Sequence, residues 1–88
     1  MSKKMTNSIT DLQVKLQNYL EVGNYRMFYR HIIQNDSELL SLFQNNKELY
    51  EYYKTDLECL KYNVAFDDTK GCIADCNSLL KYISELVK

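Results

Sequence analysis

The chain has 88 residues, 45% of them hydrophobic and 26% charged, which is the composition of one small globular domain and not of a disordered segment. It contains no proline and only two glycines, Gly23 and Gly71. Sheets with tight hairpins use more of both, so we predict an all-α fold. The net charge of −1 excludes the strongly basic composition that is typical of nucleic-acid-binding domains.

The N-terminal segment and the cysteines indicate the cellular compartment. No apolar segment follows Lys3 and Lys4, so we expect no signal peptide, and no apolar run approaches the length of a membrane span. The three cysteines are an odd number, which favours reduced thiols in a cytoplasmic protein without a cofactor. The eight tyrosines, with many asparagines and lysines, are typical of an AT-rich coding genome, as in some bacteria and phages.

Residues 1–7 are polar, and we expect them to form a frayed tail ahead of a single helical domain at 8–88. Ser8, with Asp11 three residues later, is a variant of the N-terminal capping box. The helix that follows should end at Gly23, because glycine favours the left-handed turn that closes many helices. Its predicted inner face consists of Ile9, Leu12, Leu16, Tyr19 and Leu20.

Dense apolar residues between positions 25 and 43 predict two short helices. Asn24 is a suitable N-cap for the first, over 25–34, and Asn35 and Asp36 interrupt the pattern. The second helix reaches position 43 and ends at Asn45 and Asn46. One continuous helix that bends at Asn35 and Asp36 is the alternative.

Two longer helices, at about 46–62 and 69–87, are predicted to form an antiparallel hairpin within a compact bundle of four to five helices. Asn46 is the expected N-cap of the first, and Asp68 or Thr69 that of the second. The first should direct Leu49, Tyr53, Leu57 and Leu60 inward, and Phe66 in the connection should plug the core. The second has apolar residues at alternating spacings of three and four, which predict its inner seam. They are Ile73, Cys76, Leu80, Ile83 and Val87, with Cys72, Leu79 and Leu86 beside them.

The cysteines offer a candidate metal site. Cys72 and Cys76 lie one helical turn apart, and Cys59 and His31 would complete a Cys3His zinc set. Known zinc modules pair their cysteines through a short knuckle and not across a helical turn, and His31 must come from a distant helix. We therefore favour cysteines that pack in the core, with a zinc-stapled domain as an alternative.

The charged residues of the first half offer a second alternative. Arg26 and Arg30 are one helical turn apart and alternate with Tyr25 and Tyr29, which suits contact with nucleic acid. Residues 1–35 sum to +3 and residues 36–88 to −4, so we favour arginines that pair with acids of the second half. His31 is the only histidine, and no nucleophile or phosphate-binding loop accompanies it, so we do not expect an enzyme.

The tyrosines at positions 50, 52 and 53 lead to the favoured hypothesis. At 100° per residue they cover about 300° of one helix, so they cannot all face the core. Exposed tyrosine is a typical interface anchor, and Tyr50 and Tyr52 with the acids Glu48 and Glu51 form a candidate partner-binding patch. The sequence therefore predicts a non-catalytic module that acts by occupying the surface of a partner protein.

The general character of the chain, small and helical without catalytic motifs, is similar to many phage-encoded inhibitors, immunity proteins and regulatory adaptors. That resemblance implies another protein as partner. The net charge argues against nucleic acid as a partner, and the lack of a long apolar run argues against a membrane. The heptad-like spacing of 69–87 and the apolar segment 25–33 also suit a small homodimer, so a second copy of the chain is a further candidate partner.

Overall fold

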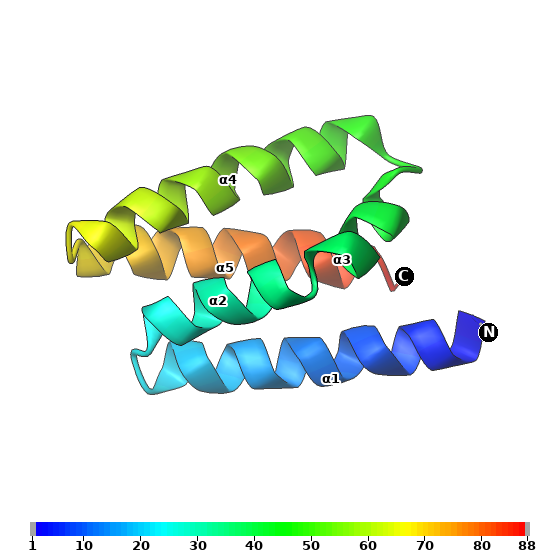
Figure 1. Cartoon of the computed structure of the whole chain (residues 1–88), viewed down its shortest axis with the longest axis horizontal. Coiled ribbons are helices and arrows are strands. Elements are labelled where there is room, and N and C mark those ends of the chain that lie inside the picture. Colours follow the sequence, from blue (N-terminus) through cyan, green and yellow to red (C-terminus); the bar gives the residue numbers. More distant parts are fainter. Residues whose placement is uncertain (1, 88) are drawn as a thin grey trace.

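The computed structural model describes residues 2–87, and it describes the side chains of residues 9–87. Within this part of the chain there are five α-helices and no strands, which confirms the predicted all-α bundle (Figure 1). The short middle segment forms two helices separated by Asn35 and not one continuous helix. The elements are α1 (Ser2–Glu21), α2 (Tyr25–Gln34), α3 (Asp36–Phe43), α4 (Lys47–Ala65) and α5 (Thr69–Glu85).

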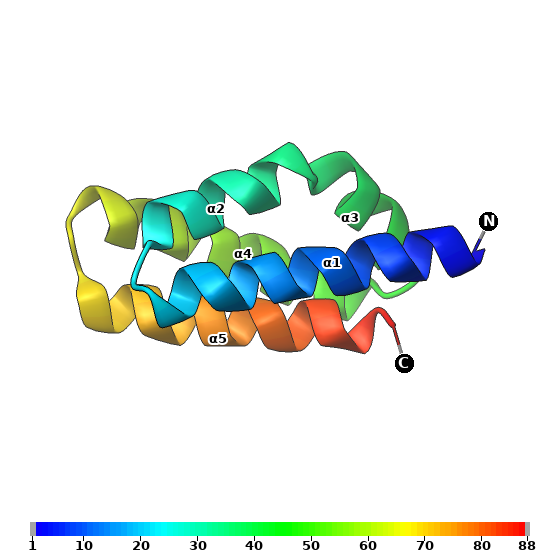
Figure 2. The same ribbon diagram turned by 90° about the horizontal axis from the view of Figure 1, so that it is seen from below.

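The predicted hairpin is formed by α4 and α5, which run antiparallel and make the most extensive contact of any pair of these helices. Helix α1 lies along α5, and α2 packs against α1, α4 and α5 (Figure 2). The turns at 22–24 and 66–68 lie at one end of the bundle (Figure 1). The arrangement is compact, with a radius of gyration of 12.3 Å.

Side-chain caps start three of the helices where the sequence predicts them. Asn24 accepts a hydrogen bond from the Met27 amide at 3.2 Å, and Asn46 accepts one from the Leu49 amide at 3.0 Å. Asp68 accepts a corresponding bond for α5. Such caps satisfy amides that have no partner within the helix, and each contributes about 1 kcal/mol to stability.

The predicted start of the first helix at Ser8 is wrong, because α1 begins at Ser2. The segment before Ser8 contains no proline or glycine, and its lysines and methionine are good helix formers, so nothing stops the helix from extending toward the N-terminus. The expected tail is therefore helical over residues 2–7, and Met1 lies outside the described residues. The helix ends as predicted, with Gly23 in the left-handed region at φ 75°.

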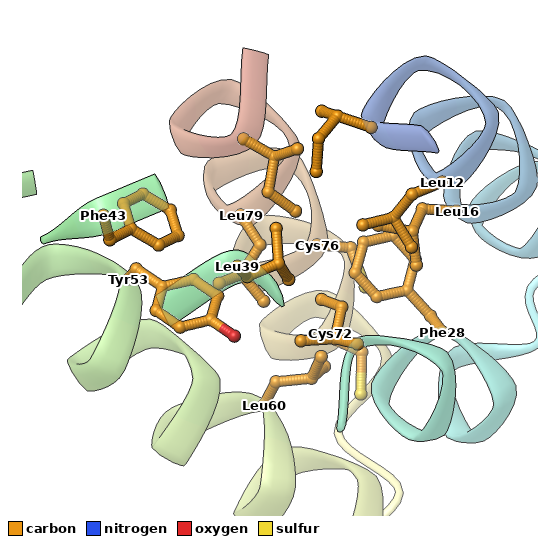
Figure 3. Close-up of a cluster of buried hydrophobic side chains, with 13 residues drawn as sticks. Leu12, Leu16, Phe28, Leu39, Phe43, Tyr53, Leu60, Cys72, Cys76 and Leu79 are labelled. Atoms are coloured by element: carbon orange, nitrogen blue, oxygen red, sulfur yellow. The ribbon is translucent and has the colours of Figure 1, made fainter. Parts of the chain in front are cut away.

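The core is built from residues of every helix. Figure 3 shows Leu12, Leu16 and Phe28 on one side of Cys76 and Leu79, with Phe43 and Tyr53 on the other. Burying apolar side chains between the hairpin and the other helices is the main source of stability. Among the side chains that the structure describes, the buried ones are Ile9, Leu12, Leu16, Phe28, Ile32, Leu39, Phe43, Tyr53, Leu60, Cys72, Cys76, Leu79 and Ile83.

The seam of α5 differs from the predicted one. Its buried residues are Cys72, Cys76, Leu79 and Ile83, whereas Ile73 is 40% exposed. The apolar residues of this helix cover a wide arc, and α1 and α4 pack on it from two directions. The positions of these two neighbours decide which part of the arc is buried.

Phe66 is not a plug for the core, because 79% of the residue is exposed. It directly follows α4 as the C-cap, where its amide donates to the Tyr62 carbonyl. Asp67 then adopts φ 56°, a left-handed conformation that turns the chain toward α5. This reversal leaves the Phe66 ring on the outside of the bundle.

Gly71 is required by close packing at the same turn. A Cβ at this position would lie 2.6 Å from Asn63 Nδ2 and 2.9 Å from Asp68 Oδ2. The Asn63 amide group cannot easily move away, because it donates a 2.6 Å hydrogen bond to Asp75. The first turn of α5 can therefore approach the last turn of α4 only with glycine here.

Candidate functional site

One face of α4 carries a row of exposed residues that continues to the C-cap, and we call it the outer stripe: Tyr52, Thr55, Cys59 and Tyr62 on the helix, followed by Phe66. Tyr52, Tyr62 and Phe66 are 52%, 53% and 79% exposed, respectively. At 100° per residue the five positions fall within an arc of about 80°. The buried residues Tyr53 and Leu60 lie about 120–140° away from the centre of this arc, toward the core.

The spacing of the outer stripe has a direct physical meaning. Its residues follow one another at intervals of three, four, three and four, which is the repeat that holds a row of side chains against a neighbouring helix. Helix α4 therefore has two such rows. The inner row packs against α5 and α2, and the outer row is exposed to solvent, with Tyr52 at its start in contact with Tyr82 of α5.

Contacts with α5 hold one end of the outer stripe in place. The Tyr52 hydroxyl donates to Glu48 at 3.2 Å, and the Tyr52 ring stacks on Tyr82 with a centroid distance of 6.1 Å. The Tyr82 hydroxyl donates to Asp56 at 2.6 Å, and this bond is the main reason that the pKa of Tyr82 is raised to about 12. Both rings are therefore oriented in the free protein, which reduces the entropy lost when a partner binds.

A hollow of about 440 Å³ opens at the middle of the outer stripe. It is lined by Lys54, Thr55, Glu58, Cys59 and Tyr62, and it forms where the two small side chains interrupt the row of rings. The ammonium group of Lys61 lies 5.9 Å from the centroid of the Tyr62 ring, within the range of a cation–π contact. The face thus combines aromatic surface, a recess and charged groups along its edge.

The structure keeps three of the four residues of the predicted patch on one side of α4 and turns Tyr50 toward the core. Tyr52 and Glu48 are hydrogen-bonded at the start of the stripe, and Glu51 is exposed on its flank. Tyr50 is half-buried against the core, with its ring 5.5 Å from the Lys54 ammonium group. Whether any of them binds a partner stays a prediction.

Sequence reasoning did not find the rest of the outer stripe. It assigned Cys59 to the core or to a metal and Phe66 to the core. The sequence does contain a signal for this row, namely the second repeat of three and four residues in the same helix. Because the helix has two such repeats, the sequence does not show which of them is buried by other helices.

The residues of the nucleic-acid alternative are arranged differently from the expectation. Arg26 and Arg30 are exposed on α2 and form no ion pair within the part of the chain whose side chains are described. The pairing that we favoured, with acids of the second half, is therefore wrong. Tyr25 and Tyr29 pack against the core and are only partly exposed beside the arginines. The alternative itself stays a prediction.

The four candidate zinc ligands are not brought together. Cys72 and Cys76 are buried, Cys59 is exposed, and His31 packs edge-on against Tyr19 at 5.9 Å. Over the described residues, no three side chains of the ligand-forming types are placed to hold a metal ion. Burial raises the pKa of Cys76 to about 12, which opposes the thiolate form that a metal ligand requires.

These thiol environments predict the outcome of labelling with a disulfide reagent such as DTNB. In the folded protein we expect Cys59 to react and Cys72 and Cys76 to be protected. One of the three thiols should therefore react, with release of one equivalent of thionitrobenzoate, until a denaturant exposes the other two. Cys59 should react more slowly than a free thiol, because desolvation and the nearby Asp75 raise its pKa. The folded Cys59→Ser variant should not react with DTNB. Rapid reaction of more than one thiol in the folded wild type would contradict the burial of Cys72 and Cys76.

Comparison with known proteins does not indicate a family or a function for this chain. No protein-family model matches the chain, and no solved structure is significantly similar to it. Among the described residues, no helix has both the length and the apolar character needed to cross a membrane. The outer stripe of α4 is therefore the feature of the molecule that bears on its function.

Proposed function

We propose that this protein is a small non-catalytic module that binds another protein through the outer stripe of α4. It acts by occupying the partner's surface, as an inhibitor, immunity factor or regulatory adaptor, and it works in the cytoplasm with its three thiols reduced. The observation that carries the proposal is a row of exposed aromatic residues: Tyr52 and Tyr62, each about half exposed, on the face of α4 that points away from the core, and the more exposed Phe66 at the C-cap that follows.

The size of this surface supports binding. With roughly 150–250 Å² per aromatic side chain, the exposed fractions correspond to about 350 Å² of aromatic surface. This summed area, in which Thr55 and Cys59 separate Tyr52 from Tyr62 and Phe66, is at the scale of the functional patches of soluble monomers. Tyrosine is also enriched among the residues that dominate binding energy, especially beside residues that exclude water from the contact.

The test begins by identifying a partner with a photo-cross-linking amino acid placed at position 62 in cells that naturally contain the protein. The affinity of the purified partner is then measured for Tyr52→Ala and Tyr62→Ala. We expect each substitution to weaken binding by about 10- to 100-fold, because an anchor residue contributes about 1.4–2.8 kcal/mol.

Val14→Ala is the matched control, because Val14 is 56% exposed but lies on α1, which makes no extensive contact with α4. It should leave the affinity unchanged. Equal loss from Val14→Ala, or full affinity of both tyrosine variants, would place the binding surface elsewhere. Circular dichroism of each variant verifies that the helices are retained.

A further inference from the structure

The charged residues of α4 are arranged around the outer stripe according to their sign. At 100° per residue, the four carboxylates of this helix lie within about 80° of the centre of the stripe, whereas its three lysines lie about 100–140° from that centre. The acids are Glu48, Glu51, Asp56 and Glu58, and the lysines are Lys47, Lys54 and Lys61. Because Asp56 lies on one side of the stripe and Glu51 and Glu58 on the other, negative charge borders it on both sides.

Helix α5 adds a further carboxylate to the same region. Asp75 accepts a 2.6 Å hydrogen bond from the side chain of Asn63, which holds this carboxylate beside α4. The Cys59 thiol at the middle of the stripe lies within the field of these groups. Its pKa is raised first by desolvation and then by Asp75, Asp56 and Glu58. The electrostatic potential at the middle of the stripe is therefore negative.

Two of the carboxylates are available to a partner. Glu51 and Glu58 are exposed, and they form no ion pair with the side chains that the structure describes. The lysines that follow them by three residues, Lys54 and Lys61, place their ammonium groups over tyrosine rings instead. Both glutamates can therefore accept charge-assisted hydrogen bonds from cationic groups of another molecule.

The shape of the stripe selects a helix as its occupant. Intervals of three and four residues match the side-chain rows of a second helix, which docks through an apolar face of the same spacing. From Tyr52 to Phe66 the stripe is about 21 Å long, or about four turns of such a helix. The hollow of about 440 Å³ at Thr55 and Cys59 offers space for a large apolar side chain from it.

We propose that the outer stripe binds a cationic amphipathic helix of the partner, with one apolar row and with lysine or arginine on both sides of that row. The inference rests on the proposed function, because it assigns a chemical class to the partner that this function requires. Opposite charges along the two edges steer the approach of such a helix and fix its position on the stripe. A helix with acidic flanks is repelled by the same carboxylates.

Two synthetic peptides of about 18 residues, or five helical turns, provide the test. Both carry the same leucine row at intervals of three and four and a single tryptophan, and the flanking positions are lysine in one and glutamate in the other. Lysine and glutamate have similar helix propensities, so the two peptides differ mainly in charge. Because the protein contains no tryptophan, the fluorescence of the peptide reports binding to the purified full chain.

We expect the lysine peptide to bind at least tenfold more tightly than the glutamate peptide at low ionic strength. The difference should shrink at about 1 M salt, where charges are screened beyond about 3 Å. Tyr62→Ala should weaken binding of the lysine peptide about tenfold, as expected for an anchor residue. Equal affinities of the two peptides, or no binding of either, overturns the proposal.

Charge reversals on the protein separate local from overall attraction. Glu51→Lys and Glu58→Lys should each weaken binding of the lysine peptide by about three- to fivefold, the upper range for an exposed ion pair. The matched control is Asp11→Lys, which makes the same change of net charge at an exposed position of α1 and should leave the affinity unchanged. If Asp11→Lys and Glu58→Lys weaken binding equally, the peptide responds to net charge alone and the proposal is wrong.

The peptide titrations and the partner measurement can fail separately. If Tyr52→Ala and Tyr62→Ala weaken binding of the natural partner while neither peptide binds, the proposed function is retained and the cationic helix is wrong. If the lysine peptide binds at the stripe while both tyrosine variants retain full affinity for the natural partner, the assignment of the stripe to that partner is wrong.

Discussion

Replacing Phe28 by alanine is expected to lower the free energy of unfolding by about 3–5 kcal/mol, the range for removing a buried phenylalanine ring. Phe28 is 0% exposed and lies beside Leu12 and Leu16 in the core (Figure 3). The substitution removes the contacts of the ring and leaves a cavity that the neighbouring helices can fill only in part. A domain of this size has a total stability of about 4–13 kcal/mol, so the variant should be marginally folded.

Phe66→Ala is the matched control for this prediction, because it removes the same side chain from a position that is 79% exposed. Its effect should stay within about 0.5 kcal/mol, as for most surface substitutions. Both variants are measured by urea denaturation followed by circular dichroism. A large decrease in the free energy of unfolding for Phe66→Ala would show that the ring is buried in the core, as predicted from the sequence, and that it does not belong to the exposed outer stripe.

Tyr53→Phe is expected to lower the free energy of unfolding by about 1.5–3 kcal/mol, the range for a hydrogen bond to a charged group. The hydroxyl of Tyr53 donates to Asp36 Oδ1 at 2.8 Å and thereby joins α4 to the first residue of α3. The ring is 1% exposed and stacks on Phe43 at 4.5 Å. The phenylalanine ring keeps this packing. The expected loss of stability therefore comes from the half-buried Asp36 carboxylate, which no longer has a hydrogen-bond donor.

The burial of Tyr53, together with this bond, makes stability depend on pH. Burial, followed by the hydrogen bond to Asp36, raises the pKa of Tyr53 far above its ordinary value of 10.0. Because the folded-state pKa is the higher one, the contribution of Tyr53 is complete below about pH 10 and decreases as the pH rises beyond it, since the unfolded chain then loses the phenolic proton more readily. Tyr53→Phe should therefore reduce the alkaline loss of stability.

Tyr52→Phe is the control for the tyrosine pair, because its hydroxyl donates to Glu48 on the surface. We expect it to change stability by less than about 1 kcal/mol, as for a typical single hydrogen bond at an exposed site. Urea titrations of both variants at neutral and alkaline pH provide the comparison. Equal effects of the two substitutions would show that the Tyr53–Asp36 bond has no special role in docking α3.

Local signals in the sequence were sufficient to predict most of the helices. Asn24, Asn46 and Asp68 accept the capping bonds expected of them, and Gly23 ends α1 in the left-handed turn. These features depend on residues within a few positions of one another, so the sequence alone contains them. The start of α1 was wrong because a capping signature at Ser8 marks a favourable start but does not prevent helix before it.

The exposed surface of α4 could be predicted only in part, because it depends on the helices that pack against α4. The sequence showed that Tyr50, Tyr52 and Tyr53 could not all face inward, and Tyr52 is indeed exposed while Tyr53 is buried. It could not show that Tyr50 packs inward, or that the face with Tyr52 and Tyr62 is the one left exposed. Both outcomes depend on where α3 and α5 lie against α4.

The sequence by itself therefore determined the helical class, the helix ends that capping side chains define, and the pairing of the last two helices. Only the tertiary structure decided which of two apolar rows on α4 is covered, which part of the wide apolar arc of α5 is buried, and that the chain reversal at Asp67 turns Phe66 outward. The physical reason is that hydrophobic burial is not directional: a periodic row shows that a face can be buried, and the neighbouring helices select the face.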